Sequence, residues 1–196
     1  MNIQLSDHFN YKKLFLFTLP SVVMMVFTSV YCVVDGFFVS NFAGKTAFAA
    51  INLIMPFIMI LGGIGFMIGT GGSALVSYTL GTGDKEKANR YFSMMVYFTI
   101  LAGILLTVLG IIFVRPIAEL FGADESMMDT CVLYGRIVIA FNAAYMLQNI
   151  FQSFFVVAEK PRLGLIVTIA AGVTNMVLDA LFVGVFKWGI VGAALA

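Results

Sequence analysis

Two aspartates lie inside long apolar segments of this 196-residue sequence, and their types and positions suit them to ion chemistry. Asp35 falls late in the first apolar segment and Asp179 falls late in the fifth. A charge at the centre of a bilayer costs about 2.5–3.5 kcal/mol on insertion scales, so such residues are by default functional candidates. On helices that rise about 1.5 Å per residue, both aspartates fall in the outer half of a membrane and can share one layer. The alternative is that each lies at the membrane surface and is simply hydrated.

Asn175 stands four residues before Asp179, so the two side chains fall on the same face of a helix. With Asp35 and a nearby hydroxyl they form an all-oxygen pocket, which suits a hard cation such as Na⁺ or a shared proton. Tyr134, near the outer end of the fourth apolar segment, is expected to reach this layer. The alternative is a helix–helix hydrogen bond, which is worth only about 0.6 kcal/mol on average in membranes.

The fourth apolar segment also carries a series of polar side chains that are candidates for a substrate cavity. The residues are Asn142, Tyr145, Gln148, Asn149 and Gln152. The last four recur at helical spacing, so one face of this helix is polar. In a helix bathed by lipid, such a face must point at protein or water. Two interpretations stay open: the wall of a substrate cavity, or hydrogen bonds between helices.

The segment Gly81–Asp84 is similar to the Gly-x-Gly-Asp pattern of intramembrane aspartyl proteases. Three charged residues directly follow Asp84, which indicates a wet loop. A catalytic pair of aspartates needs a desolvated site to hold its shared proton, so the context disfavours a protease. The single histidine, His8, lies in the N-terminal tail, and no nucleophile triad or metal-ligand spacing is evident. We therefore expect no enzyme and no resident metal or cofactor.

The composition excludes several classes of protein. Hydrophobic residues make up 61% of the chain and charged residues only 11%, against about 25% charged residues in soluble domains. Disorder requires low hydrophobicity and high charge, so it is excluded as well. The net charge of +1 offers no basic face for a nucleic acid. Cys32 and Cys131 are interpreted as small buried apolar residues rather than as a disulfide framework.

The elements that must position these residues are membrane-spanning helices, each of which needs about 20 apolar residues. After a tail over 1–10, we expect helices over about 12–42, 46–80, 91–114, 128–157 and 163–187, with a partial helix over 188–196. The fold class is therefore an all-α polytopic membrane protein. Pro20 is expected to bend the first helix, and the glycines of the second are expected to let neighbouring backbones approach closely. Because the sixth apolar run stops at about half a span, we expect the sequence to be part of a longer protein.

The orientation follows from the lysines and arginines of the short loops, which favour the cytoplasmic side. With the N-terminus inside, seven of these residues are cytoplasmic: Lys12, Lys13, Lys85, Lys87, Arg90, Lys160 and Arg162. Four are outside: Lys45, Arg115, Arg136 and Lys187. Seven against four predicts a cytoplasmic N-terminus.

The sequence resembles the multidrug and toxic compound extrusion (MATE) family of secondary transporters from about Tyr11 onward. The matching pieces, in order, are Leu19-Pro20, Val34–Val39, the glycine-rich second segment with Leu75–Ser77, Gly81–Arg90, Ile117–Ala123, Asn175–Asp179 and Trp188–Ala196. Their order and spacing carry the resemblance more than any single motif does.

The resemblance implies the N-terminal six-helix lobe of the MATE fold, truncated at the start of helix six. It also implies export of cationic or amphipathic compounds across the inner or plasma membrane in exchange for H⁺ or Na⁺. The coupling residues of one branch of the family fall here on Asp35, Asn175 and Asp179, and less directly on Tyr134. The implied partners are small-molecule substrates, the lipid bilayer and the missing C-terminal lobe.

Two further alternatives stay open within the resemblance. The first is a lipid-linked oligosaccharide flippase of the same superfamily. Such proteins tend to carry more cationic cavity residues, whereas only Arg136 is even partly intramembrane here. The second is a remnant that transports nothing.

Overall fold

The computed structural model describes residues 10–196, and every regular element in this range is a helix. The elements are α1 (Tyr11–Phe38), the π-helix η1 (Val39–Ala43), α2 (Lys45–Gly81), α3 (Lys85–Leu120), α4 (Glu125–Ala140), α5 (Asn142–Val157), α6 (Pro161–Asp179), the π-helix η2 (Ala180–Val185) and α7 (Gly189–Leu195). Of the predicted tail, residues 1–9 with His8 lie outside the described residues.

Three of the helices begin at side chains that accept a hydrogen bond from the first turn. Asn10 Oδ1 accepts from the backbone N–H of residue 13 over 2.8 Å, and Asp84 and Asp124 each accept from the N–H three residues on, over 3.0 Å. Such caps satisfy backbone donors that have no partner inside the helix. They fix where α1, α3 and α4 start. As a result α3 covers 85–120 rather than the expected 91–114.

Four helical segments are long and apolar enough to cross a membrane, and a bent pair of helices makes a fifth candidate span. The bent pair is α4 and α5, which meet at Phe141 at an angle of 51°. The expectation of one continuous helix over 128–157 was therefore wrong. At the break the N–H of Phe141 donates to Val138 O over 3.1 Å, a tighter turn than that of an α-helix.

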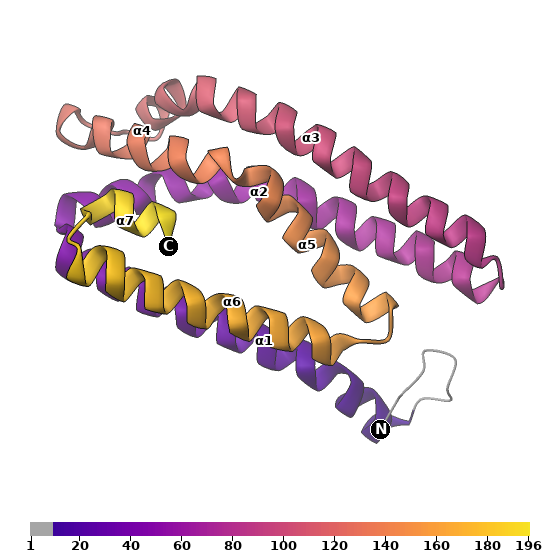
Figure 1. Cartoon of the computed structure of the whole chain (residues 1–196). Helices are drawn as coiled ribbons and strands as arrows, with labels where there is room; N and C mark the ends of the chain where they lie inside the picture. The colour runs from indigo at the N-terminus through magenta and orange to yellow at the C-terminus, as the bar shows by residue number, and fades with distance from the viewer. Residues whose placement is uncertain (1–9) are drawn as a thin grey trace.

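The helices form two groups that lie one above the other in Figure 1. Helices α2, α3, α4 and α5 pack against one another, while α1 packs along α6. The bend lets α5 leave the first group and cross toward α6. The short helix α7 contacts α4 and both π-helices, and so joins the groups at one end.

Glycines on α2 and α3 allow α5 to approach unusually closely. A Cβ on Gly65 would lie 2.6 Å from Met146 Cα, and one on Gly103 would lie 2.8 Å from Ala143 Cα. Both contacts are to backbone atoms, which cannot move aside as a flexible side chain does. The expected role of the glycines of the second segment in close packing is therefore confirmed.

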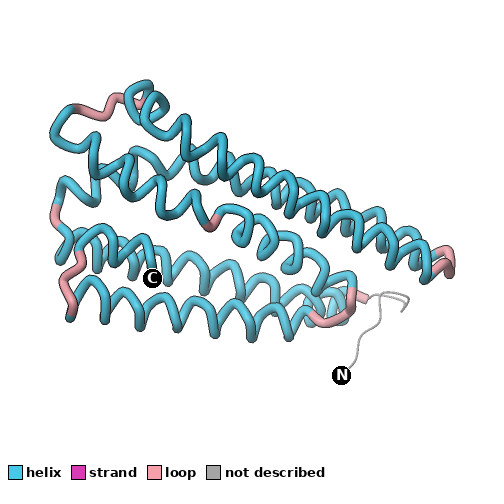
Figure 2. The backbone as a smooth tube through the Cα atoms, turned by 45° about the horizontal axis from the view of Figure 1, so that its top comes forward, coloured by secondary structure: helices cyan, strands magenta, loops and turns pink. Residues whose placement is uncertain are grey.

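The loops gather at the two ends of the bundle, where Figure 2 colours them pink. The start of α1, the α2–α3 loop and the α5–α6 loop lie at one end, and the α3–α4 loop and the segment between η2 and α7 lie at the other. Figure 2 also shows the break between α4 and α5, coloured pink, in the middle of the bundle.

The sequence predicted a bend at Pro20 and burial of both cysteines. Helix α1 runs through Pro20 without a break, so the bend there stays a prediction. Cys131 is fully buried, as expected, and its Sγ lies 3.5 Å from Ala50 O. Cys32 is exposed, so the prediction that it is buried was wrong.

Candidate functional site

Asp179 is fully buried, with 0% of its surface exposed, and neither carboxylate oxygen has a hydrogen-bond partner. It is the last residue of α6 before the helix changes to π geometry at Ala180. An ionised carboxylate buried without a partner is strongly disfavoured, so such a group is stable only when it is neutral or paired with a cation. Single π-helical turns are frequent at functional sites.

Asp35 on α1 provides the nearest charged group. It is half-buried, and its carboxyl group lies within electrostatic range of that of Asp179. The contact is electrostatic rather than a well-formed hydrogen bond, because both Asp179 oxygens stay unpartnered. Two adjacent carboxylates repel when both are ionised, so a bound proton or cation stabilises the pair. The packing of α1 along α6 holds them together.

Tyr134 and Asn175 complete the group that we call the acidic cluster: Asp35, Tyr134, Asn175 and Asp179. Tyr134 on α4 is 6% exposed and interacts electrostatically with both carboxylates. Asn175 lies one turn before Asp179 on α6, and its Oδ1 is also buried without a partner. Three helices thus bring together the four residues singled out from the sequence, with an excess of oxygen acceptors over donors.

A polar pocket of about 300 Å³ lies beside this cluster, between α1, α5 and α6. We call it the α5–α6 pocket, and its polar lining is Thr28, Tyr31, Tyr145, Gln148, Asn149, Gln152, Thr168 and Asn175. Four of the five predicted cavity residues are in this lining. Asn142 is not: it is buried, with its Nδ2 3.4 Å from Met146 Sδ.

Two of the pocket residues also make contacts between helices. Gln152 Nε2 lies 3.3 Å from Thr168 Oγ1 of α6, and Asn149 Nδ2 lies 3.5 Å from the carbonyl oxygen of Gly62 on α2. The polar face therefore lines a pocket and also makes contacts between helices, and its role as the wall of a substrate cavity stays a prediction.

Sequence reasoning missed three polar residues of the pocket lining: Thr28 and Tyr31 of α1, and Thr168 of α6. Tyr31 lies four residues before Asp35 on the same helical face, and Thr28 lies seven before. That spacing is the signal that points to them. Thr168 lies seven residues before Asn175 and offers the same signal on α6.

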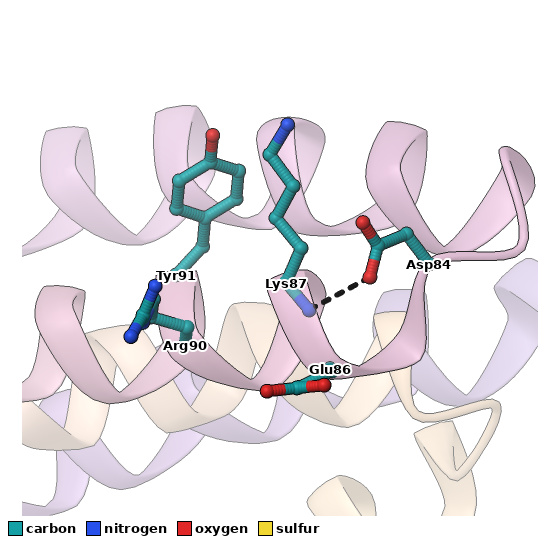
Figure 3. A pocket seen from close by; sticks show the side chains of 5 residues that line it. All are labelled: Asp84, Glu86, Lys87, Arg90 and Tyr91. Carbon is teal, nitrogen blue, oxygen red and sulfur yellow. Dashed lines mark hydrogen bonds between the residues drawn. The ribbon is translucent and has the colours of Figure 1, made fainter.

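Asp84 has the geometry of a helix cap and not that of a protease carboxylate. Figure 3 shows its side chain turned back to the backbone N–H of Lys87, with charged side chains of the same turns beside it. The residue is exposed, and so are Glu86, Lys87 and Arg90. The Lys87 ammonium lies 5.9 Å from the centre of the Tyr91 ring. A site open to water in this way lacks the desolvation that a shared proton requires.

Taken together, fold and site define a polytopic α-helical membrane protein with a buried carboxylate, Asp179, beside a half-buried one, Asp35, between its helices. The MatE family model matches residues 20–181, and the chain belongs to this family. Members of the family are transporters rather than enzymes.

The curated relatives are multidrug export proteins. The chain is 25% identical over 185 residues to multidrug export protein MepA of Staphylococcus saprophyticus, a match that covers 94% of this chain and 41% of the relative. It is 23% identical to MepA of Staphylococcus haemolyticus with the same coverage. The chain thus spans about 41% of the length of these relatives, and the matched part is their N-terminal lobe.

Solved structures show the same fold. An outward-facing multidrug resistance MATE family transporter of the MOP superfamily has a TM-score of 0.87 at 22% identity, covering 94% of this chain and 41% of that one. A MOP superfamily transporter from Pyrococcus furiosus gives the same TM-score, identity and coverage. The matched region of each corresponds to the fold described above.

Proposed function

We propose that the chain forms the N-terminal lobe of a secondary antiporter that exports cationic or amphipathic compounds across the cell membrane in exchange for H⁺ or Na⁺. The observation that carries the proposal is the fully buried Asp179, whose unpartnered oxygens lie within electrostatic range of Asp35. The multidrug export function of the MepA relatives supports the substrate class.

Each residue of the acidic cluster has a role in this proposal. Asp35 and Asp179 bind the coupling ion, Asn175 supplies an amide oxygen, and Tyr134 supplies a hydroxyl. Ion binding lowers the negative charge of the pair and changes the relative stability of two packings of α1, whose backbone lacks one hydrogen bond at Pro20. The membrane potential adds about 2.3 kcal/mol per charge per 100 mV to the ion gradient.

The α5–α6 pocket is proposed to bind the exported compound. Its tyrosine rings suit the apolar part of an amphipathic molecule, and its amides and hydroxyls suit the polar part. Its described lining contains no lysine or arginine, which disfavours an anionic lipid-linked sugar and hence the flippase alternative.

The proposal is tested with the complete native protein reconstituted in liposomes. Efflux of a cationic dye is measured under an imposed proton gradient and, separately, an imposed sodium gradient. We expect one of the gradients to drive efflux in the wild type and not in Asp179→Asn, because the amide cannot release a proton or carry a charge. Equal gradient-driven efflux by Asp179→Asn, or none by the wild type, would contradict the proposal.

A further inference from the structure

A second pocket, which we call the α1–α2 pocket, borders α1 on the side of α2, whereas the α5–α6 pocket borders it on the side of α5 and α6. It has a volume of about 480 Å³ and is lined by α1, η1 and α2. Its polar side chains are Asp35, Ser40 and Asn52, and the remainder of its lining is mostly apolar. Asp35, whose carboxyl group lies within electrostatic range of Asp179, thus also lines an open pocket.

The two aspartates differ in their access to the pockets. Asp35 lines the α1–α2 pocket, and Asn175 lines the α5–α6 pocket. Asp179 is 0% exposed and lines neither. From these two pockets, Asp179 is reached past a neighbouring residue of the acidic cluster: Asp35, which is charged, from the α1–α2 pocket, or Asn175, which is neutral, from the α5–α6 pocket.

Asn52 adds an oxygen acceptor to the wall of the α1–α2 pocket. Its Nδ2 donates to the carbonyl oxygen of Phe48 over 2.8 Å, which uses the donor end of the amide within its own helix. The amide oxygen is left as an acceptor. A monovalent cation or a hydrated proton in the pocket thus has two kinds of oxygen in the lining, the Asn52 amide of α2 and the Asp35 carboxylate of α1.

We propose that the α1–α2 pocket is the entry route of the coupling cation, which binds Asp35 first and then passes to Asp179. This inference rests on the proposed antiport function. It separates the two ligands in space: the cation approaches from the α1–α2 pocket, and the exported compound occupies the α5–α6 pocket. A change confined to the entry route alters the rate of ion-driven transport and leaves equilibrium binding of the exported compound unchanged.

Gly36→Val tests the route by filling it. Gly36 lines the pocket, and a Cβ there would lie 3.6 Å from Phe48 Cε2, which is ordinary contact, so the first atom of the added side chain is accommodated and the methyl groups extend from the pocket wall. We expect a severalfold fall in gradient-driven dye efflux with unchanged dye affinity. The matched control is Gly71→Val on α2, which lines neither pocket and whose added Cβ meets nothing within 4 Å.

The outcomes separate the two proposals. Absence of gradient-driven efflux in the wild type contradicts the antiport function itself. Normal efflux in the wild type together with an equal rate in Gly36→Val overturns the entry route alone. The proton and sodium gradients are imposed separately, so the arm that responds identifies the ion.

The native Cys32 gives a second test, in which the pocket of the wild type is modified chemically. Cys32 is exposed and lines the α1–α2 pocket, whereas Cys131 is buried. A small membrane-impermeant methanethiosulfonate is expected to modify Cys32 and slow ion-driven efflux in the wild type, and to have no effect on Cys32→Ala. Modification without a change in rate, or reaction only with a membrane-permeant reagent, would overturn the entry route.

Discussion

A carboxylate such as that of Asp179 is tolerated in an apolar bundle only if something neutralises it. The side chain is fully buried and both oxygens lack hydrogen-bond partners, whereas buried polar groups in folded proteins are normally paired. A residue under purely structural selection gains nothing from this arrangement. An ion-binding residue does, because an unsatisfied pair of carboxylates binds a cation more strongly than a satisfied one.

The hydroxyl of Tyr134 is predicted to tune the ion affinity of the acidic cluster. Tyr134→Phe keeps the buried ring, which is 6% exposed, and so preserves the packing. A hydrogen bond to a charged group is worth about 1.5–3 kcal/mol, so the ion concentration for half-maximal efflux is expected to shift about tenfold or more. Tyr78→Phe is the control, because Tyr78 is 75% exposed. The same half-maximal concentration in Tyr134→Phe and wild type would remove Tyr134 from the cluster.

The stability that Asp124 contributes as the cap of α4 is predicted to depend on pH. Hydrogen bonds from the Ser126 hydroxyl and the Met127 N–H hold the pKa of this exposed carboxyl below its ordinary value of 3.8. Because the folded-state pKa is lowered, the cap's contribution is fully present above the unfolded pKa and is lost as the pH falls through the folded one. Asp124→Ala should therefore lower the melting temperature at neutral pH, and the difference from wild type should disappear as the pH falls through the lowered pKa of Asp124. A difference that is constant with pH would show that the ionised cap does not stabilise α4.

At the scale of the elements, the all-helical class and the apolar character of the helices followed from the sequence, whereas the break between α4 and α5 did not. The bend falls at residues 140–142, which include neither proline nor glycine, so neither of the usual helix-breaking residues marks it in the sequence. The bend follows from tertiary contacts: α5 packs closely on the glycines of α2 and α3 and then crosses to α6. Such contacts join residues far apart in sequence, and a pattern within one segment does not contain them.

The close approach of α2 and α5 predicts opposite effects at two glycines of one helix. Gly65→Ala would place its Cβ 2.6 Å from Met146 Cα and force the helices apart, at a cost of about 1–3 kcal/mol. Gly71→Ala meets nothing within 4 Å and is expected to be neutral or slightly stabilising, because alanine favours helix. Thermal unfolding in detergent compares the two. A melting temperature for Gly65→Ala at or above that of Gly71→Ala would mean that the helices are not in such close contact.

At the scale of the whole molecule, the sequence likewise predicts the residues of the candidate site but not the tertiary contacts around them. Asp35, Asn175 and Asp179 were recognised because polar groups are conspicuous in apolar segments. The sequence did not predict which pocket each of them lines, because that depends on which faces of α1 meet α2 and α6. Cys32 is a second example: its apolar sequence context predicted burial, but it is exposed and lines an open pocket.

The distribution of basic residues predicts how the molecule sits in the membrane. Glu86, beside the α2–α3 loop, and Glu125, beside the α3–α4 loop, are both exposed and lie at opposite ends of α3. In a cysteine-free background, a membrane-impermeant maleimide applied to whole cells is expected to label Glu125→Cys and to spare Glu86→Cys. The reverse pattern would place the N-terminus outside.

The central claim is that Asp35 and Asp179 act as one ion site, and a double-mutant cycle tests it most directly. In the complete native protein in liposomes, the ion flux that accompanies dye efflux is measured for Asp35→Asn, Asp179→Asn and the double variant. Groups that act as a unit are non-additive, so each single variant is predicted to lose the coupled flux and the double variant to lose no more. Normal coupled flux in either single variant, or partial losses that add up in the double variant, would contradict the account.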